Sequence, residues 1–155
     1  MTAMNDDTHH TEYLTFSTAG QIFGLPIERV QEVFRPAQIT RVPLAEAKIA
    51  GVLNLRGRIV TAIDMRNRLD LHARSEGDTP MAIGIECDSE SFGLLVDTLG
   101  EVLNLPDDER EANPVNLDRR LARVCSGVYR LDGQLLVALD VDRILDLGVE
   151  AAAAA

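Results

Sequence analysis

The sequence predicts a mainly β fold, in which two similar, compact β-barrel-like subdomains pack side by side with a few short helices. Three observations support this fold class. One part of the 155-residue chain repeats another, the apolar segments are short and strand-like, and few segments have helical spacing. A half of about 60 residues is marginal alone, so we expect both halves to share one apolar core.

The repeat consists of two pairs of blocks. Residues 51–71 align with residues 127–147 at an offset of 76, without gaps, and 9 of the 21 positions are identical. Residues 23–34 align with residues 92–103 at an offset of 69, and Phe, Gly, Leu, Glu and Val coincide. Blocks in the same order at similar spacing indicate a structural duplication.

The duplication sets the expected domain organisation. We expect one domain over residues 12–147, with subdomains at about 12–71 and 80–147, and an exchange of strands between them stays open. The polar start, residues 1–11, and the end, residues 150–155, are expected to be disordered.

In the first half, residues 13–17 alternate apolar and polar side chains, and residues 21–27 return after an Ala-Gly turn, which predicts a hairpin. Residues 28–34 are expected to carry a short helical turn. Residues 51–55 and 58–63 predict a second hairpin.

In the second half, residues 81–87 and 92–96 predict a hairpin. The next hairpin turns at Asp132-Gly133, a pair that tolerates positive φ at both positions. After the closing strand of each half, Asp64 and Asp140 are expected to be N-caps of short amphipathic helices.

The charge balance excludes some classes of partner. Fifteen Lys and Arg against twenty-five Asp and Glu give a net charge of −10, which repels nucleic acid and anionic membrane surfaces. The polar start lacks the apolar segment of a secretory signal, and no apolar run approaches the length of a membrane span. Cys87 and Cys125 have no paired spacing, so we expect reduced thiols in a cytosolic protein and no zinc site.

Little in the sequence indicates catalysis. The histidines lie in the polar start and beyond a short helix, and no nucleophile, phosphate-binding or metalloprotease motif occurs. Asp64 and Asp140 occupy equal places in the two halves, as the two carboxylates of an aspartic protease do. However, the residues after them do not fit that pattern, so helix capping is the favoured interpretation.

Arg56 is an unusual turn residue. It matches Asp132 in the repeat. Asp tolerates the left-handed backbone of such a turn, whereas Arg is strained in it. Two interpretations of Arg56 stay open: its exposed guanidinium has a use, or the turn is of a different type.

Glu32 and Glu101 also coincide in the repeat, and a position at the edge of a strand or helix explains them without a binding partner. Apolar residues near them are core by default, but some can line a groove between the halves; these are Val30, Val33, Leu99 and Val102.

These segments together resemble one family. Residues 49–66, which contain Asn54-Leu-Arg-Gly57, resemble the Asn-Leu-Arg-Gly signature of the CheW family, the bacterial chemotaxis coupling proteins. Residues 30–43, 93–102 and 127–147 resemble the family's preceding segment, its second-half signature and its closing hairpin and helix. The resemblance spans about residues 12–147, and it departs from the pattern at Thr61, where the family usually has Pro.

The resemblance implies a non-enzymatic scaffold with two five-stranded, SH3-like β-barrels and with no cofactor or metal. It implies two partners, the regulatory domain of the histidine kinase CheA and the cytoplasmic hairpin tip of methyl-accepting chemotaxis receptors. It further implies a cytoplasmic protein that is recruited to membrane-associated receptor arrays.

The resemblance also implies site residues. The receptor tip binds family members in a groove between the subdomains, and motif matching places five residues near it: Val30, Glu32, Arg56, Leu99 and Val102. Arg56 would make a charge-assisted bond to an acidic receptor side chain or to a neighbouring loop. Gly51, Asn54 and Gly57 would shape the turn.

Two alternatives remain beside the chemotaxis coupler. The first is a coupling protein of another chemosensory array, one that controls pili or second-messenger output. The second is a small carboxylate-dependent hydrolase that uses Asp64 and Asp140.

Overall fold

The computed structural model describes residues 9–36, 38–41, 49–69, 79–112, 117 and 119–145. The expected tails, apart from residues 9–11, and the expected helix ends at 70–71 and 146–147 lie outside these ranges. Within them the strands are β1 (His10–Thr18), β2 (Gln21–Pro26), β3 (Val30–Phe34), β4 (Ile49–Leu55), β5 (Arg58–Asp64), β6 (Met81–Cys87), β7 (Glu90–Val96), β8 (Thr98–Pro106), β9 (Cys125–Leu131) and β10 (Gln134–Leu139). The short helices are η2 (Ile27–Arg29), α1 (Met65–Arg68), η3 (Asp107–Glu109), α2 (Arg119–Val124) and α3 (Val141–Leu145).

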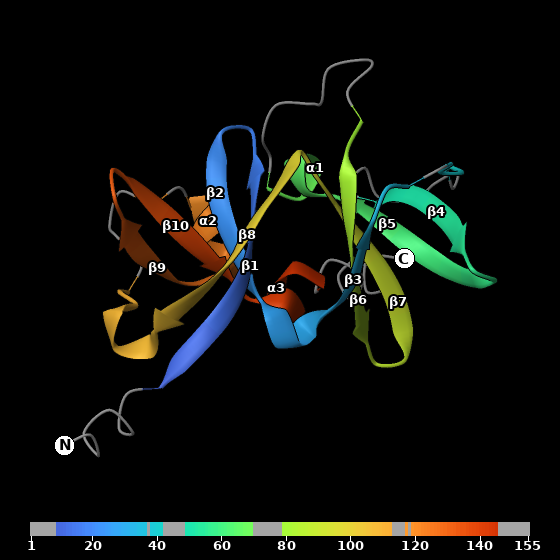
Figure 1. The fold of residues 1–155 in the computed structure, drawn as a ribbon. Helices are drawn as coiled ribbons and strands as arrows, with labels where there is room; N and C mark the ends of the chain where they lie inside the picture. The colour runs from blue at the N-terminus through green and yellow to red at the C-terminus, as the bar shows by residue number, and fades with distance from the viewer. Residues whose placement is uncertain are drawn as a thin grey trace.

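The strands form two five-stranded sheets that lie side by side (Figure 1). Sheet A has the order β8-β1-β2-β10-β9, and sheet B has the order β3-β6-β7-β5-β4. The mainly β fold with two five-stranded halves is therefore confirmed, although the hydrogen bonds leave both sheets open at their edges. Each sheet contains one parallel pair, β10 with β2 in sheet A and β5 with β7 in sheet B.

Each sheet combines strands from both halves of the sequence. Sheet A takes β1 and β2 from the first half, and sheet B takes β6 and β7 from the second. The two strand orders become identical when each strand is replaced by its equivalent in the repeat, β1 by β6, β2 by β7, β3 by β8, β4 by β9 and β5 by β10. The chain is thus a duplicated unit whose first hairpins are exchanged.

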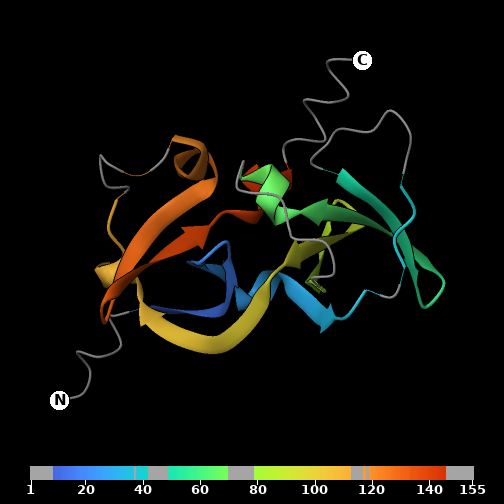
Figure 2. The same ribbon diagram turned by 90° about the horizontal axis from the view of Figure 1, so that it is seen from above.

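A shared apolar core joins the two sheets, as the marginal size of each half predicts. Its largest cluster includes Phe16 and Phe23 of sheet A, which stack at a centroid distance of 5.4 Å, and Ile63 and Ile83 of sheet B. The helices α1 and α3 lie between the sheets (Figure 2) and add Met65 to the same cluster, together with Ile144. None of the helices in the described ranges has the length and apolar character needed to span a membrane.

The short helical turn expected in residues 28–34 is confirmed only at its start. It is the 3-10 helix η2, which ends at Arg29, and the strand β3 follows it. Val30, Val33 and Phe34 pair with β6 instead, so sheet hydrogen bonds replace the local helical ones.

Candidate functional site

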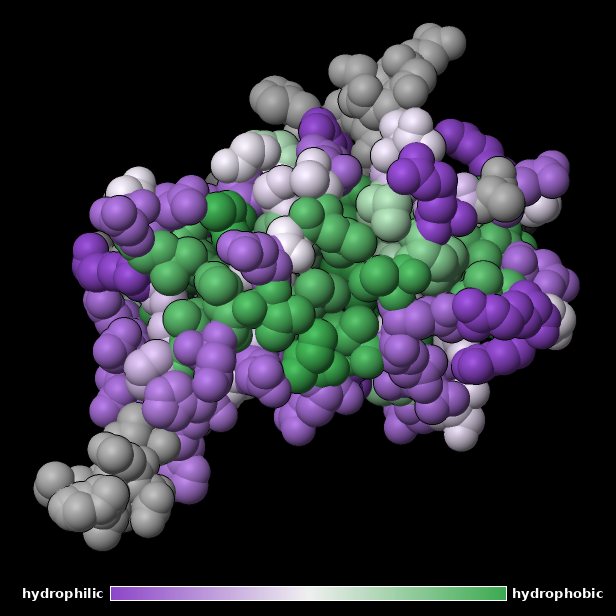
Figure 3. Space-filling view, in the orientation of Figure 1, coloured by the Kyte–Doolittle hydropathy of each residue, from purple (hydrophilic) through white to green (hydrophobic). Residues whose placement is uncertain are grey.

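The candidate site is an apolar surface between two edge strands. β3 is one edge of sheet B and β8 is one edge of sheet A. Apolar side chains form a continuous band over β8 and across to β3 on the face that both strands border (Figure 3). The apolar residues expected here are Val30 and Val33 on β3 and Leu99 and Val102 on β8, and we keep the name groove for the surface between these two strands. Val33 is 43% exposed and Val102 is 47% exposed, which is unusual for large apolar residues in so well packed a fold.

A β-bulge in β8 puts Leu99 and Val102 on one face. Leu99 pairs with Phe16 and Val102 pairs with Leu14, and the register shifts between these pairs. In a regular strand, residues three apart point to opposite faces. The bulge at Gly100 and Glu101 adds one residue and returns Val102 to the face of Leu99.

The same bulge occurs in β3. Val30 pairs with Ile85 and Val33 pairs with Ile83, and the register shifts after Val30. Both partners belong to the shared core, so Val30 and Val33 lie on the core-side face of β3. Because Val30 and Val33 match Leu99 and Val102 in the repeat, the duplication builds two equivalent walls.

Glu32 and Arg56 form a bidentate ion pair beside the β3 wall. The Nη1 atom of Arg56 lies 3.0 Å from Oε2 of Glu32, and Nη2 lies 2.8 Å from Oε1. Glu32 is on the edge strand β3, whereas Arg56 is in the β4–β5 turn that leads from the opposite edge, β4. The pair therefore bridges the two edges of sheet B. The Arg56 side chain is still 72% exposed, which leaves it open to a partner.

The β4–β5 turn holds Arg56 in a left-handed conformation. Its φ is +53° and that of Gly57 is +84°, and the Gly57 N–H donates to Oδ1 of Asn54 at 2.8 Å. In the matching β9–β10 turn only Gly133 has a positive φ, so Asp132 avoids the conformation that Arg56 adopts. The turns thus differ in type. The left-handed conformation of Arg56 costs roughly 1 kcal/mol, and a strained residue that persists in this way favours a functional role for its guanidinium.

Gly51 allows a close approach between two backbone segments. Its φ is +152°, and a Cβ atom there would lie 2.3 Å from the carbonyl oxygen of Thr40. Thr40 and Val52 exchange two backbone hydrogen bonds of 2.8 Å. Glu111 and Val128 make the equivalent pair beside Gly127 in sheet A. Gly51 acts on backbone shape and lies outside the groove.

Asp64 and Asp140 each precede a short helix. Oδ1 of Asp64 accepts the N–H of Arg66 at 2.9 Å, and Oδ1 of Asp140 accepts the N–H of Arg143 at 3.2 Å. Both contacts are those of an N-cap residue. The hydrolase alternative would need these carboxylates to face each other, and here each one is engaged by its own helix.

Removing either cap is expected to destabilise the protein. Asp64→Ala and Asp140→Ala should each lower the free energy of unfolding by about 1 kcal/mol, because an N-terminal N–H loses its acceptor. Asn at either position keeps an acceptor and should cost less. Urea unfolding followed by circular dichroism measures the four values. Equal losses for Ala and Asn would contradict a capping role.

The described residues offer little for covalent or metal chemistry. Among them no group of three or more His, Cys, Asp or Glu is placed to hold a metal ion. Burial raises the pKa of the Cys125 thiol, so it stays protonated at neutral pH and unreactive. Burial and the hydrogen bond to Tyr13 raise the pKa of Tyr129 in the same way, so neither group is an activated nucleophile.

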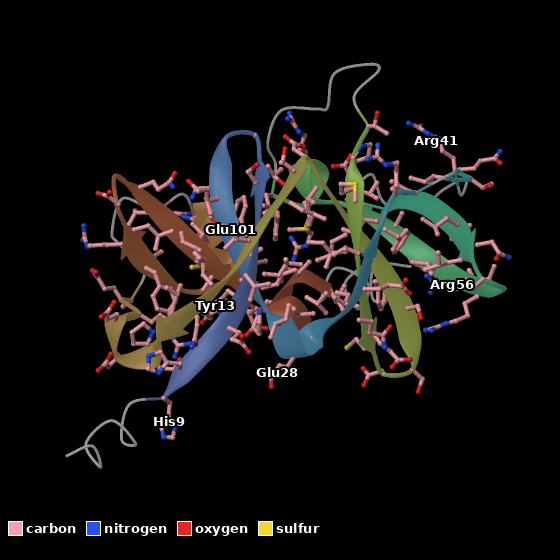
Figure 4. All side chains as sticks on the ribbon, viewed as in Figure 1. His9, Tyr13, Glu28, Arg41, Arg56 and Glu101 are labelled. Atoms are coloured by element: carbon pink, nitrogen blue, oxygen red, sulfur yellow. The ribbon has the colours of Figure 1, made fainter. Side chains whose placement is uncertain are left out.

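The structure places the five candidate receptor residues on both sheets, with Glu32 on the face of β3 opposite to Val33. Val30, Glu32 and Arg56 belong to sheet B, and Leu99 and Val102 belong to sheet A. Figure 4 shows Arg56 at the β4–β5 end of sheet B and Glu101 on β8. The sequence left Val33 open between the core and a groove, and it gave no signal for Ile59, which is 64% exposed on β5.

Comparisons with known proteins agree on one family. The family model for the CheW-like domain matches residues 12–148. The Chemotaxis protein CheW of Thermotoga maritima is 25% identical over 146 residues, which are 94% of this chain and 95% of that protein. The Bacillus subtilis protein of the same name is 27% identical over 133 residues, 86% of this chain and 85% of that one. The crystal structure of the scaffolding protein TtCheW from Thermoanaerobacter tengcongensis matches with a TM-score of 0.75 at 27% identity, over 85% of this chain and 90% of that one.

Proposed function

The chain belongs to the CheW-like domain family and is a chemotaxis scaffold and coupling protein, and we propose that it couples receptors to the histidine kinase CheA. The cytoplasmic tip of a methyl-accepting chemotaxis receptor binds in the groove. The regulatory domain of CheA binds on another surface at the same time. It catalyses no reaction itself. It acts in the cytoplasm, at receptor arrays on the membrane.

The observation that carries the proposal is the pair of matched apolar walls. A helical hairpin presents an apolar stripe along its length, and a groove with apolar side chains on both walls can cover such a stripe. Val30 and Val33 form one wall, and Leu99 and Val102 form the other. The partly exposed side chains of Val33 and Val102 gain the most from being covered.

The ion pair between Glu32 and Arg56 on sheet B adds charge recognition. Arg56 is oriented by its two bonds to Glu32, and its exposed side retains N–H donors. An acidic receptor side chain beside the groove would bond to them with little loss of side-chain entropy, because the guanidinium is already held. A charged contact at the rim sets the register of the bound helices.

The kinase surface is proposed around Ile59. This side chain lies on β5 of sheet B beside a shallow polar hollow whose lining includes Arg58, Thr61 and Glu86. An apolar residue with this exposure and a polar surround has the character of an interface centre. None of the four groove residues lines this hollow, although Gln31 of β3 does.

Two variants should separate the two bindings. Val102→Asp is expected to weaken receptor-fragment binding about tenfold, because it puts a charge into an apolar wall, and to leave kinase binding unchanged. Ile59→Asp should do the opposite. Biolayer interferometry with an immobilised receptor cytoplasmic fragment or kinase regulatory domain measures both. Loss of both bindings in either variant, with unchanged circular dichroism, would show one shared surface and would sink the two-surface proposal.

The other readings are not favoured. Neither the comparisons nor the geometry gives any support for a hydrolase or for an array that controls pili or second-messenger output. Co-purification from the native cytoplasm tests the choice of array directly, because the kinase and receptor that are retained identify the system.

A further inference from the structure

We propose that Arg66 is a positioning residue for the groove: through its ion pair with Asp97 it fixes the point where the chain crosses from sheet B to sheet A, and thereby the distance between the two groove walls. The inference rests on the proposed function for its consequence in receptor binding. Its structural part, the control of groove width, stands without it.

The pair is bidentate and mostly buried. Nε of Arg66 lies 3.0 Å from Oδ1 of Asp97, and Nη2 lies 2.5 Å from Oδ2. The side chains are 15% and 22% exposed, against 72% and 28% for Arg56 and Glu32. Two parallel charge-assisted bonds in a partly desolvated place hold one relative orientation, and water competes with them poorly.

Asp97 is the single residue between β7 and β8, and these strands belong to different sheets. Its carboxylate binds Arg66 of α1, the helix that follows β5 of sheet B. The same carboxylate accepts the N–H of Ala19, and the Asp97 N–H donates to the carbonyl of Ser17, both in sheet A or its hairpin turn. Figure 1 shows the start of β8 beside α1. The crossing residue is thus held by both sheets.

The groove depends on this crossing. Its walls are in different sheets, so its width is set by how the sheets are oriented and not by hydrogen bonds between β3 and β8. Leu99 is two residues after Asp97, and its partner Phe16 is next to Ser17. A shift at Asp97 therefore moves the β8 wall first.

The second crossing, from β2 to β3, is held less firmly. There Nη2 of Arg29 lies 3.1 Å from Oδ1 of Asp142, and the side chains are 30% and 68% exposed. Asp142 is the repeat equivalent of Arg66, whereas Arg29 matches Thr98 and not Asp97, so each crossing has an ion pair of which only one member is equivalent. Of the two, the Arg66 pair is the one built to fix an orientation.

The test compares Arg66→Lys with Arg130→Lys. Lys keeps the charge but loses the planar fork, and Arg130 forms an exposed pair with Glu111 in which one side chain is 71% exposed. Spin labels at Gln31 on β3 and Asn104 on β8, in a Cys87→Ser background, report the distance between the walls. We expect Arg66→Lys to broaden or shift that distance distribution and to weaken receptor-fragment binding about fivefold, with kinase binding and melting temperature near those of the Arg130→Lys control.

Three outcomes would overturn the inference. The first is an unchanged distance distribution in Arg66→Lys. The second is a changed distribution with wild-type receptor binding. The third is an equal loss of receptor binding, kinase binding and thermal stability, which is the signature of a merely structural role. If the wild-type protein does not bind the receptor fragment, the proposed function fails instead, and the distance measurement still decides whether Arg66 sets the groove width.

Discussion

Reversing the charge of Arg56 is expected to weaken receptor-fragment binding about thirtyfold, because it removes a charge-assisted contact and sets a like charge against the partner's carboxylate. Arg56→Glu removes the exposed N–H donors and sets a carboxylate against Glu32, with which Arg56 makes two bonds of 3.0 and 2.8 Å. The fold should persist, because the pair lies at the surface and contributes about 1 kcal/mol or less to stability. Isothermal titration calorimetry measures the affinity, and circular dichroism checks the fold.

The double variant Arg56→Glu with Glu32→Arg provides the control. It rebuilds the internal ion pair with the charges exchanged, so it should recover the small loss of stability. It should not recover receptor binding, because the positive group then lies on β3 and not in the turn. Full recovery of binding would mean that only the internal pair matters, and Arg56 would then have no direct role in recognition.

Gly51→Ala is expected to be the most destabilising of the glycine substitutions at the β4–β5 hairpin, by about 3–5 kcal/mol. Alanine at φ +152° is strained, and its Cβ would lie 2.3 Å from the Thr40 carbonyl oxygen and 2.8 Å from Cγ2 of Ile39. To relieve these contacts the two hydrogen bonds between Thr40 and Val52 must lengthen. The free energy of unfolding in urea measures the loss.

Gly57→Ala is the matched control for Gly51→Ala. Gly57 also has a positive φ, +84°, but no atom lies within 4 Å of a Cβ built on it. Only the backbone strain remains there, about 1–2 kcal/mol. Equal losses for the two variants would contradict the close approach at Gly51.

Much of the fold follows from the sequence because the duplication is visible in it. Each strand has an equivalent, and the two five-stranded sheets have the same order. The exchange of hairpins was not predictable in the same way. Since β1 and β6 are equivalent, the apolar pattern of β3 or β8 fits either one, and pattern alone does not say which it pairs with.

The helical turn was expected to extend beyond Arg29 for a specific reason. Val30 and Val33 are three residues apart, which is the spacing of one helix face. In a regular strand that spacing would split them between faces, and the bulge in β3 removes the conflict. The spacing of Leu99 and Val102 has the same origin, so an apolar spacing of three within a strand-like segment is the sequence signal of both groove walls.

The candidate site was predictable only in part. The strain at Arg56 was left open by the sequence, because the conformation of a two-residue turn depends on both strands that it joins. The partner of Arg56, Glu32, could not be inferred from spacing, since the pair spans the two edges of a curled sheet. Ile59 gave no signal because it precedes the buried Val60, and two adjacent apolar residues do not show which of them faces outward.

The measurement that tests the coupling function most directly is retention of the kinase by the receptor. A receptor cytoplasmic fragment is immobilised, and purified CheA is passed over it with and without this protein. CheA is expected to be retained in proportion to the amount of this protein that is bound, and Val102→Asp and Ile59→Asp should each strongly reduce this increase. Retention of CheA to the same extent without this protein would show that it does not couple the two partners, and unchanged retention with both variants would show that neither proposed surface binds a partner.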